Sequence, residues 1–427
     1  MSALHERRAE AEQLDVSDPA PARNLFEFPP APAGSEYESA AYFAGNSLGL
    51  MPDTARTAIE EVLTSWSTRA VSGHFTGPEP WSKQAERLAA PMAELVGAFP
   101  DEVIVMNTLT INLHLILSAL FRPDGDRRMI AIESGAFPSD DYAVASHLHW
   151  HGLDRSTLVR LEPTDDSGLF KTESLIEQIQ QIGPNLAAVV LGVVNFRTGQ
   201  LLDVEAITKA VHDVGALAIW DLAHAAGNVR TRLHEWDVDA AVWCNYKYLN
   251  GGPGALGSAF INRRFNGYGD LPRLNGWWGN APQTRFAMRR DIDLDQGAAG
   301  WQVSTPPTLA MVPVRVAVEM FHDVGFDRLI ARSQRLTAFL ESLFDEVCVT
   351  HQMTQLTPRA LSERGAQLSM IVDDAPGITD ALVALGVVPD ERPPNIVRFT
   401  PVPLYTSYLD CWRAADALIQ VLPLRPS

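Results

Sequence analysis

Short apolar runs alternate with amphipathic stretches through the middle of the chain. Five runs have the length and composition of buried strands, at 103–106, 129–132, 187–194, 216–220 and 240–244. Between them, apolar residues recur at helical spacing over 112–120, 140–149, 172–181 and 204–214. This alternation predicts an α/β fold whose sheet is mostly parallel, with helices on both faces. Ligands bind at the carboxyl ends of the strands in such sheets, so the residues that follow each run are candidates for a site.

The start of the chain has a weaker pattern. Residues 1–40 are rich in Ala, Pro and Glu and carry little periodicity, so we expect an arm that packs on the outside of the protein. Helices are predicted from Thr54 to about Ala70 and from Lys83 to Val96.

The pattern changes again from about Pro307. A long helical region runs to Phe344, followed by a strand at 366–372, a helix, a strand at 396–400 and a final helix. The sequence therefore predicts an N-terminal arm over 1–45, a large domain over 46–306 and a smaller C-terminal α+β domain over 307–427.

Composition narrows the classes of partner. The 427 residues include 34 basic and 52 acidic ones, which gives a net charge of −18. Such a surface repels nucleic acid and anionic membranes, so we expect neither as a partner. No stretch reaches the roughly 18 consecutive apolar residues of a membrane span, and the charged N-terminus does not resemble a signal peptide. Cys244, Cys348 and Cys411 lie far apart without a metal or disulfide motif, which favours a cytoplasmic protein and predicts no bound metal.

A lysine directly after an apolar run is the first candidate for chemistry. In Trp243-Cys-Asn-Tyr-Lys-Tyr-Leu-Asn250, Lys247 follows the run 240–244 and precedes a glycine-rich turn. A lysine is normally solvated, so this position indicates a buried amine able to form a Schiff base. The alternative at this point is an ordinary lysine in a surface loop.

Asp221 lies at the end of the preceding apolar run, 26 residues before Lys247. A carboxylate there is suited to pair with the pyridinium nitrogen of pyridoxal phosphate and so to keep the ring an electron sink. It is equally suited to cap the next helix. His224 lies one turn further on, either on the same face as Asp221 or as an ordinary core histidine.

Six strings in this chain resemble the kynureninase family. They are G-N-S-L-G-L at 45–50, F-P-S-D at 137–140, D-L-A-H at 221–224, Y-K-Y-L at 246–249, G-W-W-G at 276–279 and P-N-I-V-R at 394–398. The similar segments extend from about Tyr42 to Tyr405. The resemblance implies an aminotransferase-like fold, fold type I of the pyridoxal-phosphate enzymes, and hydrolysis of the Cβ–Cγ bond of kynurenine or 3-hydroxykynurenine to alanine and an anthranilic acid.

The resemblance also implies roles for individual residues. Lys247 would carry the cofactor, Asp221 would face its ring nitrogen, and Phe137 would stack on its ring. Tyr246 would be either the acid/base at the ketone and the β-carbon or only a contact of the phosphate. Further cofactor contacts implied by the matching strings are Leu109, Thr110, Ser139, Asp140 and His224.

Some of the implied contacts belong to a neighbouring subunit or to the substrate. Trp277 and Thr305 match positions that reach the cofactor across a subunit boundary, which implies a homodimer. Arg398 would grip the substrate α-carboxylate, because a guanidinium fork suits a planar anion. The other residues assigned to the substrate are Asn46, His74, Asn280 and Ser304.

The chain departs from the family pattern around the predicted aryl pocket. Asn280 stands where a histidine usually follows G-W-W-G, and Thr305 stands where other members carry asparagine. His74 and Ser304 match relatives that prefer 3-hydroxykynurenine and are able to hydrogen-bond a ring hydroxyl, so we expect a ring-hydroxylated substrate. Unsubstituted or further modified kynurenine, another reaction of this fold such as transamination or cysteine desulfuration, and a catalytically inactive protein are the alternatives.

Overall fold

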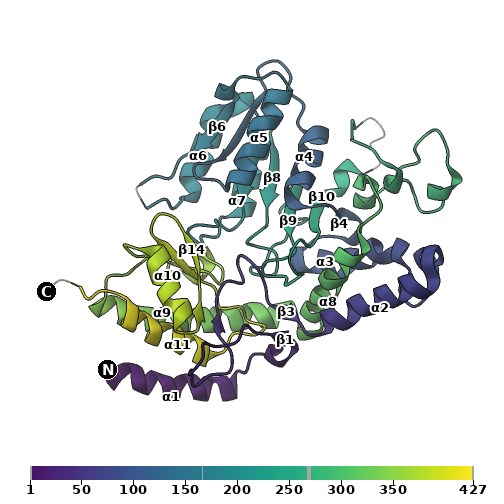
Figure 1. Ribbon diagram of the computed structural model, residues 1–427. Coiled ribbons are helices and arrows are strands. Elements are labelled where there is room, and N and C mark those ends of the chain that lie inside the picture. Colours follow the sequence, from purple (N-terminus) through teal and green to yellow (C-terminus); the bar gives the residue numbers. More distant parts are fainter. Residues whose placement is uncertain (1, 166, 267–270, 426–427) are drawn as a thin grey trace.

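A seven-stranded sheet forms the centre of the computed structural model, which describes residues 2–165, 167–266 and 271–425 (Figure 1). The strand order is β4-β10-β9-β8-β7-β5-β6. The strands are β4 (Val103–Val105), β5 (Met129–Glu133), β6 (Leu158–Leu161), β7 (Leu186–Gly192), β8 (Leu217–Asp221), β9 (Ala240–Cys244) and β10 (Gly257–Ile261).

Strand direction confirms the mostly parallel sheet. Strands β6, β5, β7, β8 and β9 are parallel to one another, whereas β10 is antiparallel to both β9 and β4. The sequence pattern missed β6 and β10. β6 is a short edge strand that is only partly buried, and β10 begins at Gly257 directly after a glycine-rich turn, so neither gives a clear apolar run.

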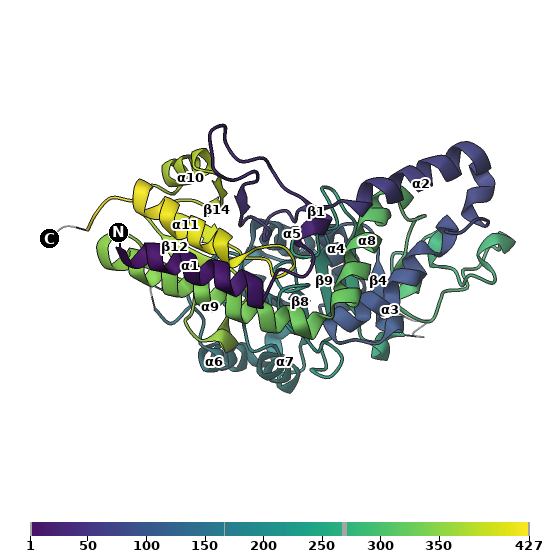
Figure 2. The ribbon, with the colours of Figure 1, turned by 90° about the horizontal axis from the view of Figure 1, so that it is seen from below.

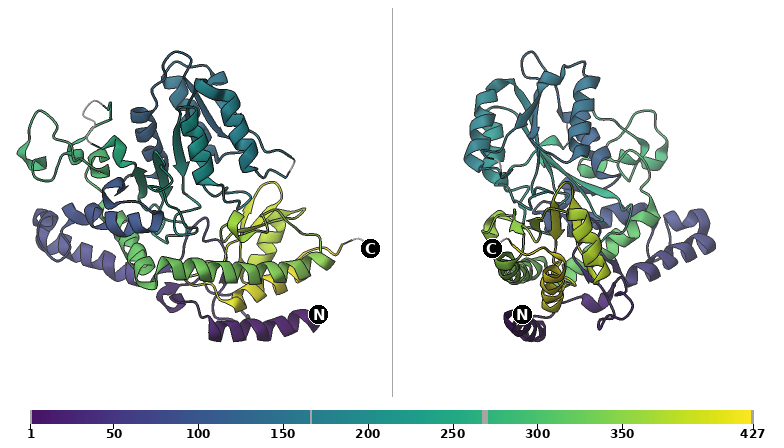
Figure 3. Two further views of the ribbon diagram at one scale, coloured as in Figure 1. Left: turned by 180° about the vertical axis from the view of Figure 1, so that it is seen from behind. Right: turned by 60° about the vertical axis from the view of Figure 1, so that its left-hand side comes forward.

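The helices predicted between the strands are present and cover both faces of the sheet (Figure 3). Helices α4 (Leu109–Leu120) and α5 (Pro138–Trp150) pack together, and so do α6 (Thr172–Ile182) and α7 (Val204–Asp213). Helix α7 is an example of why these segments form helices. Val204, Ile207 and Val211 form a buried stripe along it, and at its start the Asp203 carboxylate accepts a hydrogen bond from the Ala206 N–H.

Beside the sheet, α2 (Thr54–Arg69) and α3 (Gln84–Val96) pack against α8 (Thr308–Val324), and both lie close to their predicted positions. The long helical region predicted from Pro307 is interrupted at Gly325, whose φ of 89° breaks the helix. A second helix, α9 (Phe326–Thr350), follows and extends beyond Phe344.

The C-terminal part is built on a four-stranded antiparallel sheet with the order β11-β12-β15-β14. Its elements are β11 (Thr354–Gln355), β12 (Leu368–Ile371), α10 (Ala375–Ala384), β14 (Asp390–Arg392), β15 (Ile396–Phe399) and α11 (Tyr408–Val421). A second hydrophobic core, separate from that of the large sheet, holds these elements together.

The first residues form a helix, α1 (Ser2–Ser17), that lies along α9 and α11 on the outside of the C-terminal part (Figure 2). Leu4 and Ala11 are buried there, and the indole N–H of Trp412 donates to the Leu4 carbonyl at 2.7 Å. Further along, β1 (Phe26–Glu27) pairs with β3 (Met51–Pro52), and β2 (Ala41–Tyr42) pairs with β13 (Val387–Val388). The N-terminal segment therefore packs mainly on C-terminal elements.

Within residues 2–165, 167–266 and 271–425, no helix combines the length and the apolar character needed to cross a membrane.

Candidate active site

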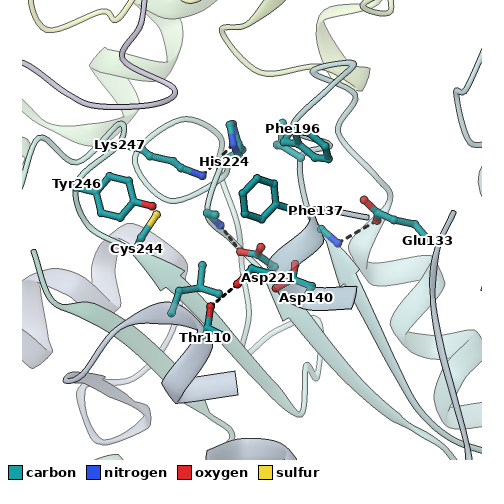
Figure 4. Close-up of a pocket in the computed structure, with 15 residues that line it drawn as sticks. Thr110, Glu133, Phe137, Asp140, Phe196, Asp221, His224, Cys244, Tyr246 and Lys247 are labelled. Atoms are coloured by element: carbon teal, nitrogen blue, oxygen red, sulfur yellow. Dashed lines mark hydrogen bonds between the residues drawn. The ribbon is translucent and has the colours of Figure 1, made fainter. Parts of the chain in front are cut away.

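The carboxyl ends of four neighbouring strands surround one pocket. Glu133 ends β5, Gly192 ends β7, Asp221 ends β8 and Cys244 ends β9. Ligands bind at the carboxyl ends of the strands in mostly parallel α/β sheets, and this pocket lies there. Its walls carry Leu109, Thr110, Glu133, Phe137, Ser139, Asp140, Gly192, Val194, Phe196, Asp221, Ala223, His224, Cys244, Tyr246 and Lys247 (Figure 4).

Lys247 projects into this pocket from the turn after β9. Its Nζ lies 3.0 Å from Nε2 of His224 and 5.8 Å from the centre of the Phe137 ring. The turn is held from outside by Gly49, whose N–H donates to the Tyr246 carbonyl at 2.8 Å. A Cβ at Gly49 would come within 2.5 Å of the Lys247 carbonyl oxygen, so this approach requires glycine. The segment 45–50 therefore packs against the turn that carries Lys247 and holds it in place.

His224 is buried beside the lysine. Burial, followed by the nearby positive charge of Lys247, keeps the pKa of His224 well below its ordinary value, so the ring is neutral. A neutral imidazole is able to accept a hydrogen bond from the lysine amine across this 3.0 Å contact.

Three buried carboxyl groups lie on the floor of the pocket: Glu133, Asp140 and Asp221. Burial raises the pKa of Asp221, while Lys247 opposes that rise. Burial and the neighbouring Asp221 raise the pKa of Asp140 well above its ordinary value, and burial raises the pKa of Glu133 to about 7. This concentration of acids next to one amine is suited to hold a cationic ring nitrogen.

Asp221 is fixed by the Ala223 N–H, which donates to its Oδ1 at 2.6 Å. Asp140 differs, because no N–H or hydroxyl group of the described residues reaches its buried Oδ1, and its carboxyl group is hydrogen-bonded to that of Asp221. A buried unpaired acceptor is costly unless a donor from a bound group reaches it.

The starts of two helices face the pocket from the opposite wall. Leu109 and Thr110 begin α4, Ser139 lies in the first turn of α5, and the two hydroxyls are 2.6 Å apart. Helix starts present free backbone N–H groups that bind phosphate. A Cβ at Gly257 would lie 2.8 Å from the Leu109 nitrogen, so glycine lets β10 pass close to the start of α4.

Tyr246 and Cys244 complete the wall beside Lys247. Burial raises the pKa of the Tyr246 phenol far above its ordinary value, so the phenol keeps its proton at neutral pH. Burial also raises the pKa of the Cys244 thiol. A buried thiol of raised pKa is a poor nucleophile, which argues against cysteine desulfuration at this site.

Arg398 does not line the pocket but lies directly behind it. Its Nη1 donates to the carbonyl of Phe196 at 2.6 Å, and the Phe196 ring packs edge-on against Phe137 with the ring centres 5.3 Å apart. Arg398 is fully buried, and its Nη2 is paired with Asp390 and donates to Ser47 at 3.1 Å. Asn46 also lies here, and with its amide oxygen turned to the guanidinium it accepts from Nε and Nη2 at 3.2 Å each.

The remaining predicted residues lie outside the pocket, around segment 271–307 and the end of α2, which share one side of the molecule (Figure 1). The Asn280 amide donates to the Trp277 carbonyl at 2.9 Å and accepts from the Asp293 N–H at 2.9 Å, so within the chain it stabilises its own loop. The ring of Phe75 packs on Phe286, which also contacts Trp277. Those outside are His74, Trp277, Asn280, Ser304 and Thr305.

Several residues of these sites were missed by the sequence analysis. Glu133 ends a run that was predicted to stop at residue 132, so a strand longer by one residue would have identified it. Phe196 and Asp390 gave no local signal, because their importance comes from tertiary contacts: Phe196 packs on Phe137, and Asp390 pairs with Arg398 across the antiparallel strands β14 and β15.

The pocket fits pyridoxal phosphate on its own chemistry. It offers an amine at Lys247, buried acids at Asp221 and Asp140, an aromatic face at Phe137, and two helix starts with hydroxyls at Thr110 and Ser139. The unpaired Asp140 oxygen provides an acceptor for a protonated ring nitrogen or for a group that hydrogen-bonds beside it.

Comparison with solved structures supports the fold. A cysteine desulfurase from Thermococcus onnurineus superposes with a TM-score of 0.72 at 16% identity, covering 90% of this chain and 94% of the other. The desulfurase CsdA of Escherichia coli gives 0.73 at 14% identity, covering 90% and 96%. A C-DES variant with glycine covalently linked to its PLP cofactor gives 0.69 at 16% identity, covering 89% and 95%. At these identities the likeness concerns the fold.

Comparison of sequences identifies the family. Residues 41–364 match the model of the class V aminotransferases, and residues 329–418 match the kynureninase C-terminal domain. The kynureninase of Salinispora tropica is 48% identical over 97% of both chains, and that of Koribacter versatilis is 44% identical over 95% of this chain and 96% of the other. The chain therefore belongs to the kynureninase family, a branch of the class V aminotransferases.

Proposed function

We propose that this chain uses pyridoxal phosphate to hydrolyse the Cβ–Cγ bond of kynurenine, or of a ring-modified kynurenine, to alanine and an anthranilic acid. The observation that carries the proposal is the pairing of Lys247 and Asp221 in one pocket at the strand ends, with a neutral histidine beside the amine. Family membership supports the same reaction.

The bound cofactor supplies an electron sink that stabilises negative charge on the amino-acid carbons. In this chain, Lys247 would hold the cofactor and move the proton at the α-carbon, and neutral His224, 3.0 Å from its Nζ, would orient the amine by a hydrogen bond. The Asp221 carboxylate would keep the ring nitrogen protonated. The hydroxyls of Thr110 and Ser139 and the start of α4 would bind the phosphate.

Tyr246 is our candidate for the acid that protonates the β-carbon. Its raised pKa means that the phenol holds a proton throughout the neutral range, which suits a donor rather than a base. The alternative role, a hydrogen bond to the cofactor phosphate, uses the same protonated phenol.

We propose a homodimer in which each subunit completes the site of its partner. His74, Trp277, Asn280, Ser304 and Thr305 lie outside the pocket within one chain. The segments that carry them, 271–307 and the residues just after α2, share one side of the molecule (Figure 1). The same region exposes large apolar side chains that a partner would cover: Phe75, Leu274, Trp277, Phe286 and Met288. A cytoplasmic location fits the three free cysteines.

The decisive test of the reaction is alanine release by the loaded protein from kynurenine and, separately, from 3-hydroxykynurenine. We expect alanine and the matching anthranilic acid in equal amounts. If His74 and Ser304 bind a ring hydroxyl, kcat/KM is higher for 3-hydroxykynurenine, and a strong preference for kynurenine would contradict that assignment. Release of a keto acid without alanine would instead indicate transamination.

The shared site is tested by mixing two variants, each of which the proposal expects to be inactive. Lys247→Ala and Thr305→Ala homodimers are unfolded together and refolded, so that about half of the dimers are mixed. A mixed dimer has one site with both intact residues, so activity should return to roughly a quarter of that of the parent. No recovery, with dimers present by sedimentation, would place Thr305 in the site of its own chain or outside the site.

A further inference from the structure

Arg398 is already paired with a carboxylate of the protein itself. The guanidinium is fully buried, and one of its Nη2 hydrogen bonds goes to the side chain of Asp390. A buried arginine needs a counter-ion, and Asp390 is the carboxylate joined to it by an ion pair within the described residues. A substrate carboxylate that approaches Arg398 must therefore share the guanidinium with Asp390 or displace it.

A second arginine is positioned to receive Asp390. The side chain of Arg392 donates from Nη1 to Oδ1 of Asp390 at 2.8 Å, so Asp390 bridges Arg392 and Arg398 through its two oxygens. The side chain of Arg392 is 31% exposed, whereas Arg398 is buried. A small outward rotation of Asp390 would keep its ion pair with Arg392 and release the buried arginine.

The cluster of Arg392, Arg398 and Asp390 carries more positive than negative charge. Arg392 and Arg398 carry two positive charges, and Asp390 supplies one negative charge between them. Both arginines act on the pocket, because their charges lower the pKa of His224, after burial and Lys247. A further carboxylate near Arg398 would balance this charge.

Ser47 provides a hydrogen-bonding group both when Asp390 is paired with Arg398 and after Asp390 has moved away. Its hydroxyl is bonded to Asp390, and its oxygen accepts from Arg398 at 3.1 Å and from Arg392 at 3.3 Å. Once Asp390 has moved, the same hydroxyl is free to donate to an incoming carboxylate. Asn46 and the Phe196 carbonyl meanwhile hold the guanidinium in place.

We propose that Asp390 is a resident competitor for Arg398, which a ligand must displace with its own α-carboxylate, and that Arg392 holds Asp390 after the exchange. Asp390 thereby makes the site specific for ligands that carry a carboxylate. An amine without a carboxylate has no anion that could replace Asp390, so Asp390 stays paired with Arg398. The inference rests on the proposed function, since it assumes that Arg398 binds the substrate carboxylate.

The test compares two small ligands that differ only in the carboxylate. L-Alanine and ethylamine are titrated separately into pyridoxal-phosphate-loaded protein, and binding is followed by the change in visible absorption. In Asp390→Asn the competitor has lost its charge, so we expect L-alanine to bind about five- to tenfold more tightly and ethylamine to change less than about twofold. Asp390→Glu, which keeps the charge, should bind L-alanine like the parent.

Arg392→Gln gives an independent readout. Without Arg392, the released Asp390 carboxylate has no partner, so L-alanine should bind about fivefold more weakly while ethylamine again stays within about twofold. This variant leaves the buried Arg398–Asp390 pair intact, so it keeps the proposal testable if Asp390→Asn does not fold.

The L-alanine affinity of Asp390→Asn also defines the result that would contradict the proposal. If Asp390 only orients Arg398, then Asp390→Asn weakens or does not change L-alanine binding, and the proposal is wrong. Failure of the proposed function is distinguished by the parent protein, which would then release no alanine from either kynurenine while its binding of L-alanine is measured separately.

Discussion

The lysine pocket and the arginine cluster behind it are built in different ways. The pocket takes its groups from the ends of strands that are neighbours in the sheet and from the first turns of α4 and α5, each next to its own element in the sequence. The cluster joins residues 46–47, Phe196 and 390–398, which come from three distant parts of the chain. The lysine pocket is therefore formed by the large sheet and the elements next to it. The arginine cluster forms only when the C-terminal part packs against that sheet.

The two regions also differ in charge. The pocket holds three buried acids around one amine, while the cluster holds two arginines around one acid. Acidic groups are thus concentrated where a cationic ring nitrogen would bind, and positive charge where a carboxylate would bind. We expect pocket variants to affect turnover and cluster variants to affect substrate binding.

The largest effect is expected from the pocket. Lys247→Ala removes the amine that carries the cofactor and moves the proton, so alanine release should fall by about 10³-fold or more, with kcat reduced rather than KM raised. Rates at saturating kynurenine and the visible absorption of the protein measure this. Lys209→Ala, at an exposed lysine paired with Asp213, is the matched control and should behave like the parent. Turnover at the parental rate in Lys247→Ala would refute the assignment.

The cluster is tested next by Arg398→Gln. Losing the guanidinium should raise KM for kynurenine by about 100-fold and leave kcat within a few-fold, because the carboxylate contact is made in both ground and transition states. Breaking the buried pair with Asp390 also costs about 3–5 kcal/mol of unfolding free energy, so thermal unfolding is measured alongside. A fall in kcat with KM unchanged would move Arg398 into the catalytic step.

Tyr246→Phe separates the two roles of this residue. If the phenol is the acid, kcat should fall by about 10²-fold while the affinity for pyridoxal phosphate stays the same. If it only binds the phosphate, the cofactor affinity should fall and kcat at saturating cofactor should stay near the parental value. Equilibrium dialysis of the cofactor and steady-state kinetics together decide between them.

The smallest effect concerns stability. The pKa of buried Glu133 is raised to about 7, whereas the unfolded carboxyl ionises near its ordinary value. The folded state therefore binds a proton more tightly, and stability should decrease as the pH rises toward 7, by up to roughly 3 kcal/mol. Glu133→Gln should show a smaller decrease between pH 5 and pH 8 in denaturant titrations. The exposed Glu177→Gln should keep the parental decrease, and an unchanged slope in Glu133→Gln would show that Glu133 does not cause it.

Much of the fold and of the lysine pocket followed from the sequence. Apolar runs and helical spacing gave five of the strands and the helices between them, because buried strands and amphipathic helices each leave a local pattern. Lys247 and Asp221 were found because each stands at or just after the end of such a run. The resemblance to the kynureninase family implied Leu109, Thr110, Phe137, Ser139, Asp140, His224 and Tyr246, whereas Glu133 and Phe196 were missed. The short edge strand β6 and the antiparallel β10 were missed, because partial burial and a starting glycine weaken the pattern.

The sequence alone determined which residues are available for chemistry: an amine at 247, a carboxylate at 221 and a guanidinium at 398, each placed after a buried strand or within one. Only the tertiary structure decided what each of them faces. It placed His224 against the lysine, put Asp390 on Arg398 and left Trp277 and Thr305 outside the pocket. The reason is physical: apolar patterns report burial along the chain, whereas ion pairs and pKa shifts depend on how side chains from different elements pack together.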